Sequence, residues 1–337
     1  MRHINIPVFI PHLGCPNNCV FCNQRTISGI QSFDPSDTGR IIDEALSTVS
    51  ADDEVEIAFF GGSFTGSEFD LMTKLLQIAY SYIERGAVKS VRCSTRPDYI
   101  DENIISVLKR YGVSTVELGL QSIAPEVLRL SKRNHIVGDA LRACKLIVDS
   151  GISLVGQMMI GLPGSTLENE IETARFIIDS GASAARIYPT VVFRGTELCD
   201  MAASGIYTPL SLDEAVTRSA AVLKLFRSSG VRVIRIGLCS SENLGSEETY
   251  FAGPNHPSLG ELVENRLYFD DIYSQAKELK LKKDDTLLVR VAPGTLSKAV
   301  GQKRKNKTLL TDMLGIRDVV FKEDYDARYI EVSVLDK

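Results

Sequence analysis

The sequence predicts an α/β protein: a partial TIM-like (β/α)6 barrel at residues 1–240, followed by a small C-terminal α/β domain at 241–337. Short apolar runs alternate with amphipathic stretches of helical length, which favours parallel strands joined by right-handed crossovers. Periodicity alone leaves a doubly wound sheet open. Glycine-rich or polar segments follow several of the strands, where barrel enzymes gather their sites, and this favours the barrel.

The elements are predicted in chain order from their apolar patterns. Strands of the first domain are short, nearly continuous apolar or β-branched runs at 4–10, 55–60, 90–94, 114–120, 153–160, 184–188 and 231–236. Helices are amphipathic stretches, most of them closed by a glycine, at 35–49, 68–85, 102–111, 138–150, 166–180 and 212–229.

The strand and helix rhythm breaks after about residue 237, in a polar and turn-rich segment that indicates a domain boundary. The remainder predicts a helix near 259–279, a strand at 286–291, one or two helices through 314, and strands near 318–321 and 329–334. These elements form the small C-terminal domain.

Composition predicts an ordinary globular protein. The chain has 337 residues, of which 44% are hydrophobic and 24% charged, enough for one large core with or without a smaller one. No apolar stretch approaches the roughly 20 residues that span a bilayer, and the start does not read as a signal peptide, so no membrane association and a cytoplasmic location are expected. The net charge of -5 argues against nonspecific coating of nucleic acid, but it leaves room for one local basic site.

The cysteine pattern is that of a metal site. Seven cysteines are present, and three of them, Cys15, Cys19 and Cys22, lie within eight positions, which is not a disulfide framework. The four scattered cysteines are expected to be small core residues: Cys93, Cys144, Cys199 and Cys239.

Three thiolates at this spacing suit an iron–sulfur cluster. A four-iron cluster with three cysteine ligands leaves one iron free to bind another molecule. Gly14 and Pro16 favour the tight turns that would fold the loop around a cube corner. Two alternatives stay open: three packed core thiols, or a zinc site, which would need a fourth ligand such as His12 or His256.

With an aromatic residue, Phe21, directly before the last cysteine, this loop resembles the signature of the radical S-adenosylmethionine (SAM) superfamily. The resemblance implies a 4Fe–4S cluster that passes an electron to SAM, and a 5'-deoxyadenosyl radical that abstracts hydrogen from a substrate. It also implies a reductant such as flavodoxin or ferredoxin as partner.

Within that superfamily the sequence is most similar to the radical SAM core of the Elongator catalytic subunit, and more loosely to oxygen-independent coproporphyrinogen oxidase. The segments that carry this likeness span roughly the first 200 residues: 60–65, 95–99, 116–122, 158–164 and 187–190. The Elongator subunit has a wider gap between its first two cysteines and an acetyltransferase domain after the barrel. The tail of this chain lacks the length and the glycine-rich pyrophosphate loop for such a domain, so acetyl transfer is not expected of it.

The likeness also implies which residues bind SAM. Gln121 and Gln157, near the ends of the fourth and fifth strands, correspond to ribose contacts, and Arg133 to the carboxylate partner, because a guanidinium is a planar fork of donors. Without the family, Arg133 would be assigned to a solvated basic turn. The likeness also implies that the amino group of SAM is bound by Gly61, Gly62 and Ser63. Glycines let the backbone approach a ligand closely, and Ser63 replaces the acidic residue that is usual at this position.

One further site residue is predicted from burial. Glu117 lies inside an apolar strand, where a carboxylate must be partnered or face a barrel interior. It is assigned to the cofactor site, with a structural ion pair as the alternative. No catalytic acid, second radical carrier or oligomeric state is predicted.

The substrate is predicted from the Elongator likeness and one basic segment. Lys303, Arg304 and Lys305 lie within 298–307 and form a cluster that can track an RNA backbone or be an ordinary solvated surface. RNA, in particular transfer RNA, is the first expectation. A small metabolite or tetrapyrrole is the second, and a noncatalytic iron–sulfur or zinc redox sensor that binds nucleic acid is a third.

Overall fold

Backbone contacts divide the chain into two compact units. The computed structural model describes residues 2–15, 19–24, 28, 30, 32–50, 52–238 and 246–335. One unit comprises Met1–Ser211 with Leu225–Asn255, and the other comprises Leu212–Lys224 with His256–Lys337. The boundary predicted at residue 240 lies in the stretch 239–245, outside the described residues.

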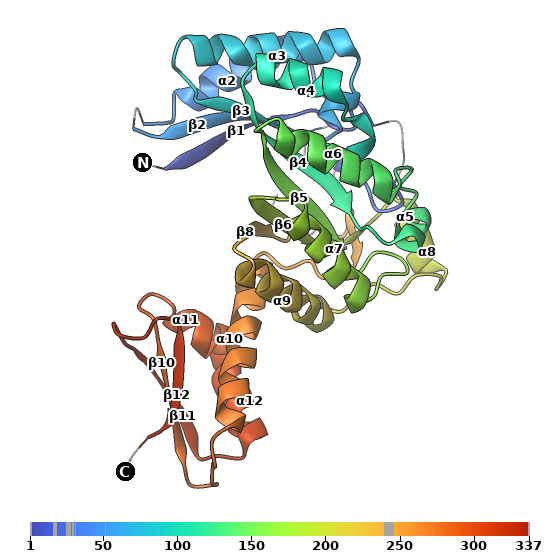
Figure 1. Cartoon of the computed structure of the whole chain (residues 1–337). Helices are drawn as coiled ribbons and strands as arrows, with labels where there is room; N and C mark the ends of the chain where they lie inside the picture. Colours follow the sequence, from blue (N-terminus) through green and yellow to red (C-terminus); the bar gives the residue numbers. More distant parts are fainter. Residues whose placement is uncertain are drawn as a thin grey trace. The chain divides into compact units, whose positions relative to one another are not determined.

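The first unit is built on a seven-stranded sheet, and every pair of neighbouring strands is parallel. The strands follow the sheet in chain order: β1 (His3–Phe9), β2 (Glu54–Phe60), β3 (Ser90–Thr95), β4 (Val113–Gln121), β5 (Ser153–Ile160), β6 (Ala184–Pro189) and β8 (Arg232–Ile236). The sheet curves without closing, with β1 and β8 at its two edges (Figure 1). The predicted partial α/β barrel is confirmed, and each of the seven apolar runs is one of its strands.

Helices connect these strands and cover one face of the sheet (Figure 1). The predicted ones are α2 (Thr38–Leu46), α3 (Phe69–Glu84), α4 (Glu102–Arg110), α6 (Val137–Asp149) and α7 (Leu167–Asp179). The other predicted helix, α9 (Leu212–Ser228), belongs to the second unit over Leu212–Lys224. The apolar residues of these helices face the core because burial removes them from water, as for Ile105 and Leu108 of α4, and caps fix some of the helix ends. In α4, for example, Asp101 accepts the amide proton of Ile104 at 2.8 Å, while Lys109 and Arg110 complement the carboxyl end of the helix dipole.

The described part of this unit also holds short α-helices and strands that were not predicted. They are α5 (Pro125–Leu130), α8 (Glu197–Ala203) and the two strands of a small antiparallel pair, β7 (Val192–Phe193) and β9 (Tyr250–Ala252). Helices of two turns or less and strands of two or three residues carry too little periodicity to be recognised in a sequence.

The second unit has its own core. Its elements are α10 (Leu259–Lys277), β10 (Thr286–Val291), α11 (Leu296–Val300), α12 (Lys305–Leu314), β11 (Asp318–Glu323) and β12 (Ile330–Val334). Strand β10 is central, parallel to β11 and antiparallel to β12. Ile272 of α10, Leu310 of α12 and Val289 of β10 are fully buried in one apolar cluster, so the predicted small α/β domain is confirmed. No helix in the described part of the chain has the length and hydropathy needed to cross a membrane.

Candidate active site

The predicted site residues converge at the carboxyl edge of the parallel sheet. The cysteine segment follows β1, Gly61 to Ser63 follow β2, and Gln121 ends β4. Parallel strands end at one edge, so segments far apart in the sequence meet there. The sheet topology therefore assembles the site.

Of the three clustered cysteines, Cys19 is buried and the other two are partly buried. Local turns shape the parts of the loop that the structure describes. The amide of Cys15 donates to the carbonyl of His12 at 3.1 Å, and the amide of Cys22 donates to that of Cys19 at 3.0 Å. Residues 16–18 lie outside the described residues.

The electrostatics of this thiol group favour the protonated form of Cys22. Burial, followed by the neighbouring Cys19 and Cys15, raises the pKa of Cys22 to about 12. Thiols placed this close do not ionise together in an apolar setting unless positive charge compensates them. Iron binding would supply that charge and release the protons, so the donor set fits an iron–sulfur cluster.

The glycine segment after β2 packs against the cysteine loop. A Cβ at Gly62 would overlap the carbonyl oxygen of Leu13 and would lie 2.8 Å from that of Ile10. Gly14 has a left-handed φ of +67°, and a Cβ there would overlap the carbonyl of Ser63. The close approach that these glycines permit is therefore between two backbones, and it fixes the segment that carries Cys15. Contact of Gly61, Gly62 and Ser63 with SAM stays a prediction.

Two buried guanidinium groups reach the same thiol. Arg96 Nη1 lies 3.8 Å and Arg133 Nη1 lies 3.7 Å from Cys19 Sγ. Arg133 also donates to the carbonyl of Gly119, and its Nε has no partner among the described residues. Arg133 is thus buried beside the cysteines, which disagrees with the solvated basic turn and agrees with an anion-binding role.

The two glutamines lie on neighbouring strands. Gln121 has a left-handed φ of +65° at the end of β4, and its buried amide oxygen accepts from no described residue. A strained backbone and an unpartnered polar atom together are typical of a ligand contact. Gln157 of β5 is half-buried, and its amide nitrogen donates to Glu117 at 2.8 Å.

Glu117 lies at the centre of a buried ion network. Its carboxylate contacts Arg92 at 3.0 Å and Arg186 at 2.7 Å, in addition to the Gln157 amide. Arg92 in turn contacts Glu56 at 2.7 Å. These are the partners that the ion-pair alternative requires, while a contact of Glu117 with SAM stays a prediction.

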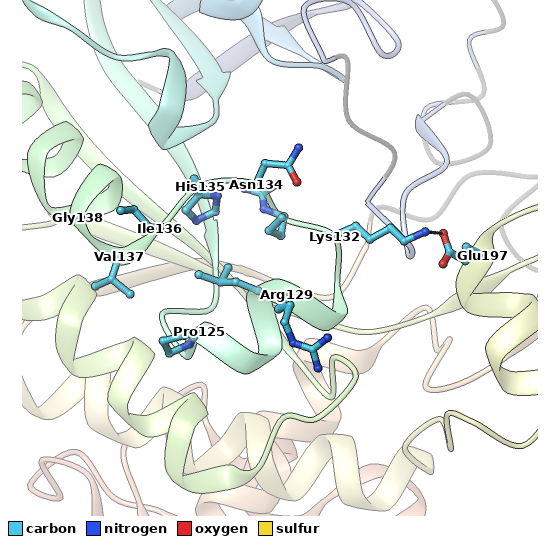
Figure 2. Close-up of a pocket in the computed structure, with 11 residues that line it drawn as sticks. Pro125, Arg129, Lys132, Asn134, His135, Ile136, Val137, Gly138 and Glu197 are labelled. Carbon is cyan, nitrogen blue, oxygen red and sulfur yellow. Dashed lines mark hydrogen bonds and ion pairs between the residues drawn. The ribbon is translucent and has the colours of Figure 1, made fainter.

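A pocket of about 830 Å³ lies along the connection between β4 and α6 and reaches Glu197 of α8 (Figure 2). Lys132 and Glu197 form an ion pair of 2.6 Å at one side of it. His135 lines the pocket but is only 2% exposed, and neither ring nitrogen has a partner among the described residues. Burial, and next the charge of Arg133, lower its pKa to about 3, so the ring is neutral.

The histidines named for a zinc site are otherwise engaged. Nε2 of His12 accepts the amide proton of Gln24 at 3.1 Å, and Nδ1 of His256 accepts that of Ser258 at 3.1 Å. Among the described residues, no three His, Cys, Asp or Glu side chains are grouped around one point as ligands of a single ion would be.

The scattered cysteines that the structure describes pack in the interior. Cys93 and Cys144 are buried, and burial raises their pKa values to about 12 and about 11. Cys199 is partly buried against the Leu198 cluster. This agrees with the expectation of core thiols, and Cys239 lies outside the described residues.

Sequence reasoning missed Arg96, His135, Arg92 and Arg186 as members of this region. Arg186 carried a usable signal, because it is a charged residue inside an apolar run, as Glu117 is. Arg96 carried none that pointed to Cys19, since the two are 77 positions apart.

Comparison with known proteins agrees with this geometry. A family model described as the Radical SAM superfamily matches residues 9–177, and one described as the Radical SAM C-terminal domain matches residues 182–268. The tRNA uridine(34) acetyltransferase of Methanocaldococcus infernus is 30% identical over 243 residues, covering 60% of this chain and 46% of that protein. Elongator complex protein 3 of Homo sapiens is 31% identical over 209 residues, covering 60% and 37%. The chain therefore spans less than half the length of these relatives.

Solved structures show the same architecture. The archaeal Methanocaldococcus infernus Elp3 with an N-terminal deletion aligns with a TM-score of 0.64 and 26% identity, over 80% of this chain and 63% of that one. Coproporphyrinogen III oxidase (HemN) of Escherichia coli aligns with a TM-score of 0.50 and 16% identity, over 80% and 58%, which is a likeness of fold alone.

A partial parallel barrel with a thiol loop at the carboxyl edge of its strands defines an enzyme of the iron–sulfur class. The chain belongs to the radical SAM superfamily, and its core is homologous to the radical SAM region of Elongator Elp3. Its cofactors are a 4Fe–4S cluster and SAM.

Proposed function

We propose that Cys15, Cys19 and Cys22 hold the 4Fe–4S cluster with one iron open to SAM, and that the enzyme modifies transfer RNA. The observation that carries the first part is the group of three cysteines at the carboxyl edge of the sheet, of which Cys19 is buried and is contacted by two guanidinium groups. When bound, the cluster supplies one electron to SAM, and the resulting 5'-deoxyadenosyl radical abstracts a hydrogen atom from the substrate.

The chain's own residues bind and orient SAM in this proposal. Arg133 donates to the SAM carboxylate, for which its buried Nε is available. Gln121 offers the ribose an amide whose oxygen has no described partner, and Gln157 keeps its own amide oxygen after donating to Glu117. Phe21 packs on the apolar cluster of Val20 and helps to close the site against water.

Transfer RNA as substrate is supported by two observations. The relative from Methanocaldococcus infernus is named a tRNA uridine(34) acetyltransferase. The basic segment of the second unit exposes Lys303 and Arg304, which have no acidic partner among the described residues, whereas Lys305 pairs with Asp213 at 3.1 Å. Backbone phosphates are the ligands that such unpaired cations attract.

The cluster and SAM assignment is tested by anaerobic reconstitution with iron and sulfide, followed by dithionite and SAM. Wild-type protein is expected to form 5'-deoxyadenosine. Cys19→Ser is expected to lose at least about 99% of that activity, because it lacks one of the three proposed cluster ligands. A hundredfold loss in rate corresponds to a barrier about 2.7 kcal/mol higher. Cys199→Ser, outside the loop, is the matched control and should retain it. An intact cluster that never cleaves SAM would favour the redox-sensor alternative.

The substrate is tested separately. RNA that copurifies with the chain is identified first and is expected to be transfer RNA. The modified-nucleoside profiles of transfer RNA from cells with and without the protein should then differ at one nucleoside. If binding to transfer RNA is undetectable at every salt concentration, the small-metabolite alternative replaces RNA.

A further inference from the structure

The side chain of Arg96 has a position that SAM binding does not explain. It follows β3, is only 4% exposed, and directs Nη1 at Cys19 Sγ from 3.8 Å. The negative charge of Asp98 compensates the buried guanidinium, and Nη1 is left to face the sulfur. Cluster ligation would add negative charge at Cys19.

Arg96 is held in this orientation by groups other than the cysteine. Its Nε and Nη2 donate to the two carboxylate oxygens of Asp98 at 2.9 and 2.8 Å. Its backbone amide donates to Ser63 Oγ at 3.2 Å. The bidentate pair fixes the plane of the guanidinium, so the remaining nitrogen, Nη1, faces Cys19.

The two arginines at Cys19 therefore differ in what they leave available. Arg133 approaches the same sulfur at 3.7 Å but keeps an unpartnered Nε that can serve an anionic ligand. All three guanidinium nitrogens of Arg96 are engaged, two by Asp98 and one by the sulfur. Arg96 is thus directed at the cysteine and not at a ligand.

We propose that Arg96, oriented by Asp98, donates a charge-assisted hydrogen bond to the cluster ligand Cys19 and raises the reduction potential of the cluster. Hydrogen bonds to ligand sulfur and nearby charge are among the factors that set such potentials. A one-electron donor reduces the cluster, no bond or proton is transferred, and the added negative charge is delocalised partly onto the thiolates. A guanidinium at 3.8 Å stabilises the reduced form more than the oxidised form.

Asp98 reduces this effect without cancelling it, because its carboxylate lies on the far edge of the guanidinium. Arg96 acts through Cys19 and is a positioning residue. The inference rests on the proposed ligand set of Cys15, Cys19 and Cys22, and it is independent of RNA as the substrate.

The test is a redox titration of the reconstituted holoenzyme, followed by electron paramagnetic resonance of the reduced cluster. Arg96→Gln is expected to make reduction at least about tenfold less favourable, a midpoint lower by about 59 mV for one electron. Arg96→Lys keeps the positive charge but lacks the planar guanidinium, and its midpoint potential should lie between those of wild type and Arg96→Gln. The control is Arg142→Gln, which removes an exposed guanidinium paired with Asp139 at 2.9 Å and should leave the midpoint unchanged.

Iron and sulfide content and the Fe–S stretching frequencies in resonance Raman spectra accompany each titration. A fully loaded Arg96→Gln protein with the wild-type midpoint overturns the proposal. Loss of the cluster from both Arg96 variants also overturns it, because Arg96 would then act in assembling the site. A wild-type protein that forms no cluster under these conditions would instead overturn the proposed function.

Discussion

At the scale of single residues, Glu117 is 1% exposed and pairs with both Arg92 and Arg186. Removing its charge leaves two buried cations without their shared partner, and breaking such a pair costs about 3–5 kcal/mol. We expect Glu117→Gln to lower the free energy of unfolding in urea by about that amount. Glu126→Gln, which breaks the exposed pair with Arg129, should change it by less than about 1 kcal/mol. Equal losses in the two variants would contradict the network.

A second prediction at this scale concerns pH. The pKa of buried His135 is about 3, below the roughly 6.5 of an unfolded chain, so only the unfolded state binds its proton between those values. This contribution to stability is complete above pH 6.5 and is lost as the pH falls from there toward 3. When the pH is lowered from 7 to 5, the free energy of unfolding should fall in both proteins, and we expect the fall to be about 1–2 kcal/mol smaller in His135→Leu than in wild type. The measurement is urea unfolding of the iron-free chain. The same loss in both proteins would show that the ring is protonated in the folded state.

At the scale of elements, the contact between the segments after β1 and β2 decides where the cysteines lie. Gly62→Ala forces a methyl group into the backbone of Leu13 and should cost about 1–3 kcal/mol. It should also reduce the iron bound after reconstitution. Gly39→Ala is the control, because its Cβ would be 3.6 Å from the nearest atom, Tyr82 Oη, within helix α2, where alanine is favoured over glycine. Normal iron content in Gly62→Ala would show that the cysteine loop still binds iron after its backbone has moved to make room for the methyl group.

At the scale of the whole molecule, the second unit is predicted to supply phosphate contacts. Lys303 and Arg304 are exposed and have left-handed φ values of +53° and +61°, a conformation that costs energy outside glycine. The double variant Lys303→Glu, Arg304→Glu should weaken binding of transfer RNA and reduce the slope of log affinity against log salt by about 2. SAM cleavage without RNA should not change.

The matched control for that prediction reverses the charge of Lys282 and Lys283, two adjacent exposed lysines of the same unit. A general effect of net charge would weaken binding equally in both double variants and would contradict a local RNA contact.

The sequence by itself determined the long strands and helices, and its resemblance to the radical SAM superfamily implied the cofactors. Continuous apolar runs and closing glycines gave the parallel sheet, because burial on both faces and helix termination are local requirements. The cysteine spacing indicated a cluster site, because the three candidate ligands lie in one short loop. Short helices such as α5 and α8 were not predicted, because they contain too few residues for a helical periodicity to be recognised in the sequence.

Only the tertiary structure decided which distant side chains meet the cysteines and which pair with one another. Arg96 reaches Cys19 because β1 and β3 both end at one edge of the sheet. Glu117 of β4 meets Arg92 of the neighbouring strand β3 and Arg186 of β6, which lies two strands away in the same sheet. Such contacts depend on strand order and register, which local sequence patterns do not contain.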